Sequence, residues 1–163
     1  MNMAHLYRIS HDETKYREHV NKAIEINPHH SRSLQAKGLL CLNECDYDNS
    51  IDLLNRANES NRKGVPFFET MLFFCHLGKN DWLSANQSVE RNMRDNDHSR
   101  YHAFKAIVLA HEGKIEESQH WLKKYQENRP EIKTLADYQK VVPEVNKEVK
   151  DILMDGMKKA GLK

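Results

Sequence analysis

The chain has 163 residues, and its 25 Lys and Arg nearly balance its 24 Asp and Glu, which leaves a formal charge of +1. This balance argues against nucleic acid or an anionic membrane as a direct partner, and no apolar run approaches the roughly 20 residues that a membrane span needs. Three cysteines without a CxxC pair predict reduced thiols and a cytoplasmic protein.

The first helical pattern runs from Tyr16 into Asn27-Pro28 and restarts within a few residues. Proline ends a helix because it lacks an N–H and clashes with the preceding turn. Ser31 is predicted to cap the next helix with its hydroxyl. A break this short places the two helices nearly antiparallel, and its repetition along a chain builds a superhelix.

The pattern then recurs with a period of 34 between Pro28 and Pro130. Matching first-helix positions are 34 apart at Leu34, Phe68 and His102, at Gly38, Leu72 and Ala106, and at Cys41, Cys75 and Leu109. Their i, i+4, i+7 spacing predicts one buried face. The second helices are predicted to begin at Tyr47, Trp82 and Ile115, with intervals of 35 and 33. This difference is interpreted as one extra turn residue around Gly78–Asn80.

A helix–turn–helix unit of 34 residues resembles the tetratricopeptide repeat (TPR) family. The stretch DYDNSIDLLNRA from Asp46 to Ala57 carries its second-helix pattern: an aromatic residue, a small residue, a large apolar residue and then alanine. The resemblance implies an all-α, right-handed superhelix (an α-solenoid) with C-terminal capping helices. The expected TPR array covers residues 1–130, with a degenerate unit at 1–30 and repeats at about 31–62, 63–96 and 97–130.

Residues 131–163 contain no further repeat and are predicted to be capping helices. A short helix is expected over Thr134–Val142 because Pro143 follows it. A final helix carries an apolar stripe, and Gly161 is its predicted C-cap.

The tail also resembles the end of the TPR region of bacterial winged-helix transcriptional regulators and class III adenylate cyclases. The matching residues are Pro130, Leu135, Pro143, Leu153, Gly156, Ala160, Gly161 and Leu162. This resemblance implies that the chain is the C-terminal regulatory part of a larger bacterial signalling or transcription protein. It implies no catalytic or DNA-reading residue in this chain.

Catalytic and metal-binding patterns are absent from the sequence. Glycines are isolated, so no phosphate loop is predicted, and neither GxSxG nor HExxH occurs. His98 and His102 have helical i, i+4 spacing, but no further ligands lie near them in sequence. Cys41 and Cys75 fall on the buried column and are expected to pack as small hydrophobes. We therefore expect no enzyme, no cofactor and no metal.

Surface recognition remains the expected role. In a TPR superhelix the first helices line the concave face, so their positions outside the core predict contacts with a protein or peptide. These groove candidates are Arg32, Gln35, Leu39, Asn43, Glu69, Phe73, His76, Arg100, Ala103, Ile107 and His111. Leu39, Phe73 and Ile107 are 34 apart and would suit an extended or helical segment. Alternatively, these residues pack against a neighbouring part of the same chain.

The sequence thus favours a non-catalytic protein-interaction or oligomerisation module that acts as a scaffold or regulatory domain. A homo-oligomer would follow if the degenerate first unit leaves an apolar face uncovered. A stand-alone adaptor or secretion chaperone is the alternative in the same class. A domain that senses a metal or small ligand is the alternative from another class.

Overall fold

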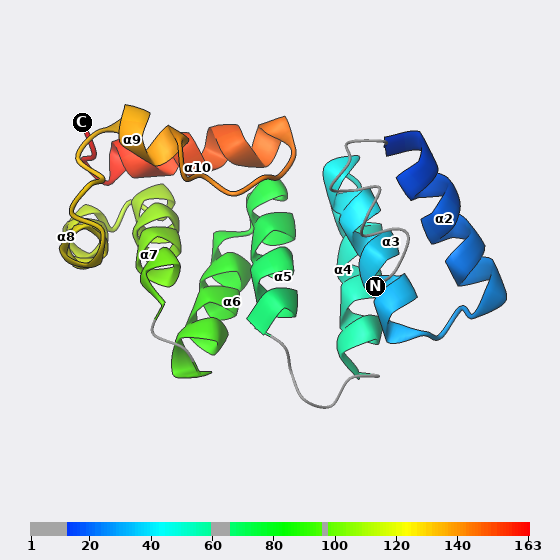
Figure 1. Cartoon of the computed structure of the whole chain (residues 1–163). Helices are drawn as coiled ribbons and strands as arrows, with labels where there is room; N and C mark the ends of the chain where they lie inside the picture. Colours follow the sequence, from blue (N-terminus) through cyan, green and yellow to red (C-terminus); the bar gives the residue numbers. More distant parts are fainter. Residues whose placement is uncertain (1–12, 60–65, 96–97) are drawn as a thin grey trace.

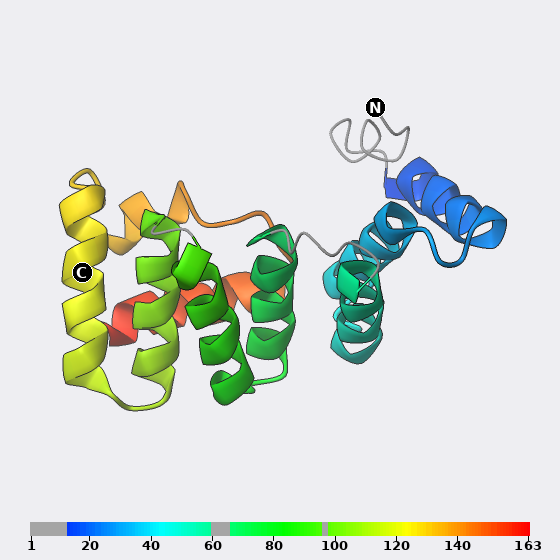
Figure 2. The same cartoon turned by 90° about the horizontal axis from the view of Figure 1, so that it is seen from below.

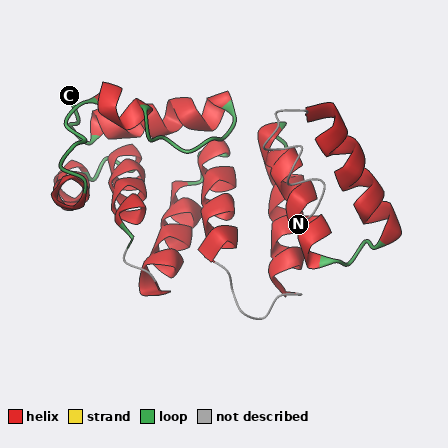
Figure 3. Ribbon diagram, viewed as in Figure 1, coloured by secondary structure: helices red, strands yellow, loops and turns green. Residues whose placement is uncertain are grey.

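The computed structural model describes residues 13–59, 66–95 and 98–163, and this part of the chain contains nine helices and no strand (Figures 1 and 3). The helices pack in adjacent pairs and form an all-α helical-repeat solenoid, which confirms the predicted fold class. Their bounds are α2 Glu13–Ile26, α3 Ser31–Asn43, α4 Tyr47–Glu59, α5 Pro66–Gly78, α6 Trp82–Asp95, α7 Ser99–His111, α8 Ile115–Asn128, α9 Leu135–Gln139 and α10 Lys147–Lys159. Residues 1–12 of the expected degenerate unit and the expected boundaries near 62 and 96 lie outside the described residues.

Three helical hairpins, α3–α4, α5–α6 and α7–α8, share one turn conformation. The second helices begin at Tyr47, Trp82 and Ile115, as predicted. In each turn one residue has a positive φ, and the backbone N–H of the next residue donates to the carbonyl five positions earlier. These left-handed residues are Cys45 (φ 61°), Asn80 (φ 55°) and Gly113 (φ 78°), and the bonds are Asp46 to Cys41 (2.8 Å), Asp81 to His76 (2.9 Å) and Lys114 to Leu109 (2.9 Å).

The prediction of an extra turn residue around Gly78–Asn80 is wrong. The first helices begin at Ser31, Pro66 and Ser99, and these intervals of 35 and 33 match those of the second helices. The middle unit is therefore displaced as a whole, because six residues connect α4 to α5 and three connect α6 to α7. A loop between two units can change its length at little cost in free energy, whereas a turn closed by backbone hydrogen bonds cannot gain a residue without losing those bonds. As a consequence, Phe74 and not Phe73 is the counterpart of Leu39 and Ile107.

The break at Pro28 is closed differently from the prediction. The N-cap residue of α3 is His30, not Ser31. The Ser31 hydroxyl instead donates to the backbone carbonyl of Ala57 at 2.8 Å. This bond ties the start of α3 to the end of α4, so the serine joins two helices of one hairpin.

Small residues bring the paired helices together. The hydroxyl of Ser50 on α4 donates to the carbonyl of Gly38 on α3 at 2.8 Å, and Ser118 on α8 makes the equivalent bond to Ala106 on α7 at 2.7 Å. Ala85 occupies this position in the middle pair and is fully buried. Short side chains permit a close approach of two helices, so the small residues at these equivalent positions explain why the hairpins have the same packing.

The tail forms two helices, as predicted, but the first is shorter than expected. α9 ends at Gln139, and Thr134 is its N-cap residue and not its first helical residue. α10 ends in a Schellman motif: the Gly161 N–H donates to the Lys158 carbonyl, and the Leu162 N–H donates to that of Met157, both at 3.0 Å. The C-cap residue is Ala160 and not Gly161 as predicted; Gly161 follows it with φ 103°, a conformation that favours glycine.

Candidate functional site: the face of the first helices

α10 lies across α5 and α7 (Figures 1 and 2), and the residue that precedes it, Asn146, contacts the end of α3. At its start, the Asn146 side chain donates to the carbonyl of Leu42 at 2.6 Å, while its oxygen accepts from the Val149 N–H at 2.9 Å and caps the helix. The C-terminal helix therefore touches all three repeated units, including one more than 100 positions earlier in the sequence.

An amphipathic stripe holds α10 in place. Val149, Leu153 and Met157 are all fully buried in the main core. Gly156 lies against Ile107 on α7, because an added Cβ would be only 2.5 Å from the Ile107 Cγ2. The absence of a side chain at this position lets the two helices approach closely.

Polar contacts add to this packing at the start and in the middle of α10. The phenol of Tyr47 donates to the Glu148 carboxylate at 2.9 Å, and burial raises the pKa of Tyr47, so the phenol stays neutral. About one turn further along α10, His111 Nε2 lies 3.2 Å from the carbonyl of Ile152. The His111 ring also stacks on Trp82, with centroids 4.4 Å apart. Burial lowers the pKa of His111, which favours its neutral form in this contact.

The structure separates the groove candidates by exposure. Those on α3 retain solvent access: Arg32 and Asn43 are exposed, and Gln35 and Leu39 are partly so. Arg100 is exposed at the start of α7. Phe73 and Ile107 have no exposed surface and Ala103 is 2% exposed, so this conformation presents none of them to an external peptide. Their burial matches the alternative in which they pack within the chain.

The remaining candidates, Glu69, His76 and His111, are partly exposed. The Glu69 carboxylate accepts from Arg91 Nε at 2.8 Å. His76 Nδ1 lies 3.8 Å from an Asp81 carboxylate oxygen and makes no hydrogen bond among the described residues. With His111 held by Trp82 and α10, the largest free stretch of the predicted groove is on α3.

Sequence reasoning missed the residues that place α10 in this groove. Gly156 was part of the tail pattern, but its contact with α7 was not predicted. Asn146 and Glu148 bind residues of the first unit, and no local pattern reports contacts over such a distance. One signal was present: a glycine inside an amphipathic helix often marks a close approach.

Within residues 13–59, 66–95 and 98–163, no three His, Cys, Asp or Glu side chains gather in a way that could hold a metal ion. Burial raises the pKa of the Cys75 thiol to about 11 and also raises that of Cys41. Both thiols are therefore protonated at neutral pH and serve packing. Within the same ranges, every helix is too short or too polar to cross a bilayer.

Comparison with protein-family models and with curated proteins finds no match for this chain.

Proposed function

We propose that the chain is a non-catalytic, TPR-type protein-interaction module whose partner binds the face of the first helices. The observation that carries the proposal is α10 itself. This amphipathic helix lies on that face and buries Val149, Leu153 and Met157 there. A surface that accommodates one amphipathic helix has the shape and apolarity that helix-in-groove recognition needs.

The partner binds mainly at α3 in this proposal. α10 covers the corresponding parts of α5 and α7, whereas Leu39 stays partly exposed between Arg32 and Asn43. An apolar residue flanked by polar residues matches the usual arrangement of a protein interface, in which an apolar centre is surrounded by a polar rim. In a bacterial signalling or transcription protein, such a module would serve as the C-terminal regulatory part.

Affinity capture of the endogenous protein, with bound proteins quantified by mass spectrometry, tests the proposal. The test variant is Leu39→Asp, and the matched control is Lys123→Glu, which changes an exposed residue on α8. We expect one abundant partner that is lost with Leu39→Asp and kept with Lys123→Glu. A partner retained equally by both variants would place its binding site elsewhere.

A further inference from the structure

A second candidate site lies at the opposite end of the repeat array, between α7, α8 and the tail. Here a cavity of about 270 Å³ opens between the first turn of α7, the last turn of α8 and α9. Its apolar wall is made by the rings of Phe104, Tyr125 and Tyr138. The volume is at the lower end of the range for small-molecule pockets.

Positive charge surrounds the cavity. Arg100 in the first turn of α7 and Arg129, which follows α8, line it together with His98. The Arg100 guanidinium has no ion pair or hydrogen bond among the described residues, while Arg129 pairs with Glu131. The pKa of His98 is lowered, first by burial and then by the charges of these two arginines. The start of α7 adds the positive end of a helix dipole.

His98 is oriented as a hydrogen-bond donor. Its Nδ1 accepts the backbone N–H of Arg100 at 3.2 Å and so caps α7. A neutral imidazole has only one N–H, so its proton lies on Nε2. The ring can therefore donate a hydrogen bond to an anion while it keeps the cap.

One buried polar group on the cavity wall lacks a partner. Tyr138 is 2% exposed, and its hydroxyl has no hydrogen bond among the described residues. Such groups are rare in folded proteins, but this oxygen is itself enclosed, so a molecule in the cavity would meet the tyrosine ring and not the hydroxyl.

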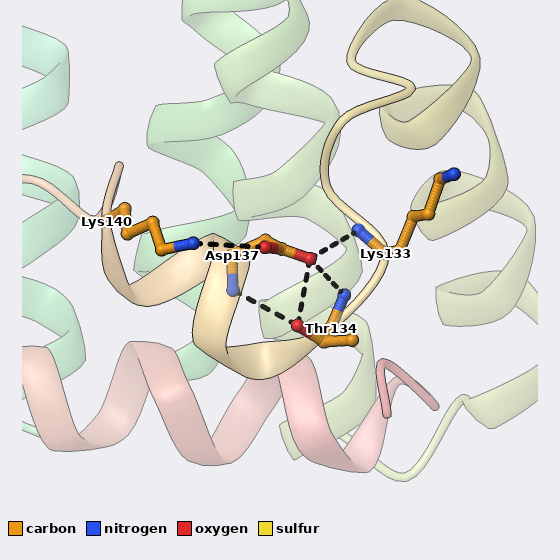
Figure 4. Close-up of polar contacts among 4 residues, drawn as sticks. All are labelled: Lys133, Thr134, Asp137 and Lys140. Atoms are coloured by element: carbon orange, nitrogen blue, oxygen red, sulfur yellow. Dashed lines mark hydrogen bonds and ion pairs between the residues drawn. The ribbon is translucent and has the colours of Figure 1, made fainter.

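The placement of this tyrosine is well defined by the residue before it. The Asp137 carboxylate accepts from the N–H groups of Lys133 (3.2 Å) and Thr134 (3.0 Å), and the Asp137 N–H donates to the Thr134 hydroxyl at 3.2 Å (Figure 4). This capping box fixes the start of α9, the helix that carries Tyr138.

We propose that this cavity binds a small organic acid. Arg100 and Arg129 would receive the carboxylate, and the three aromatic rings would pack against the apolar body. Two arginines favour a planar carboxylate because their N–H groups match its geometry. The apolar wall favours an acid with a hydrocarbon body over a bare inorganic anion. This site is separate from the partner surface on α3, and its test does not depend on that proposal.

Titration of the full chain, followed by amide chemical shifts, tests the proposal. The probes are benzoate, phenylacetate and hexanoate, each compared with its neutral amide and with inorganic phosphate. At least one carboxylate should give saturable shifts in the first turn of α7 and in α9, and its amide should bind at least tenfold more weakly. Failure of all three acids, or phosphate binding as tightly as the best acid, would overturn the proposal.

Three variants then connect binding to the named residues. Arg100→Gln should weaken binding about tenfold, whereas Glu131→Gln should strengthen it by releasing Arg129. Tyr138→Phe keeps the ring and removes only the enclosed hydroxyl, so it should leave binding unchanged while the unliganded protein unfolds at the same or a higher temperature. Arg32→Gln, far away on α3, is the matched charge control and should change nothing. Equal affinities for Arg100→Gln and Arg32→Gln would contradict the assignment.

Discussion

Two asparagines on α6 provide a test of the packing, because their substitution by alanine should have opposite effects. Asn92 is 2% exposed, and neither its amide oxygen nor its amide nitrogen has a hydrogen bond among the described residues. Asn86 is partly buried, and its oxygen accepts from the Lys105 ammonium at 2.6 Å. Asn92 also occupies a position where the repeat pattern has alanine in the first unit, at Ala57.

The magnitudes follow from these contacts. A buried polar group without a partner costs about 1–3 kcal/mol, and alanine gains up to about 0.7 kcal/mol in helix propensity. After an offset of about 1 kcal/mol for lost packing, Asn92→Ala should raise the free energy of unfolding by about 1–2 kcal/mol. Asn86→Ala loses a hydrogen bond to a charged group, worth about 1.5–3 kcal/mol. It should therefore lower the free energy of unfolding by about 1–2 kcal/mol.

Urea unfolding followed by circular dichroism measures both variants, with thermal unfolding as a second readout. For a chain of this size, each kcal/mol corresponds to about 2–4 °C in Tm. If Asn92→Ala destabilises the protein as much as Asn86→Ala does, Asn92 has a hydrogen-bond partner, and the reasoning is refuted.

Three further predictions concern close packing and pH. Gly78→Ala should lower the free energy of unfolding by about 2 kcal/mol, because the added Cβ would lie 2.1 Å from the Tyr47 ring. An unchanged urea midpoint would contradict this and show that the ring can move aside. Gly156→Ala should lower the free energy of unfolding by about 1 kcal/mol, since overpacking against Ile107 exceeds the gain in helix propensity. Amide hydrogen exchange should become faster in α10, with α3 as the internal reference. Burial lowers the pKa of His76 and His111 from 6.5, so both side chains bind protons more readily in the unfolded chain. The free energy of unfolding should therefore be highest above about pH 6.5 and should decrease below it. Urea midpoints that stay constant between pH 7.5 and 5.5 would contradict this.

The periodic part of the fold was predictable from sequence, whereas its long-range contacts were not. The second-helix starts at Tyr47, Trp82 and Ile115 followed from local patterns that recur in each unit. The register of the middle unit did not, because α5 is apolar around its circumference and several alignments fit it equally well. Phe73 illustrates the difficulty: it was predicted to face a groove, but it is buried and stacks on Phe104 at 4.4 Å.

The candidate site shows the same limit. Periodicity identified the first helices as a binding face, but it could not show that α10 covers part of that face. Asn146 and Glu148 reach Leu42 and Tyr47 across most of the chain. Only the three-dimensional arrangement reveals such contacts, and it leaves α3 as the accessible part of the predicted groove.

The most direct test of the central claim, that this face binds a helical segment, is a peptide-binding measurement. The ligand is a fluorescently labelled peptide of residues 144–163, titrated into the full wild-type chain and into Gly156→Leu, whose larger side chain should displace α10 from Ile107. Circular dichroism first establishes that the variant keeps its helices. We predict saturable binding, seen as raised fluorescence anisotropy, to Gly156→Leu and at most weak binding to the wild type. A folded Gly156→Leu that binds no peptide would contradict the claim.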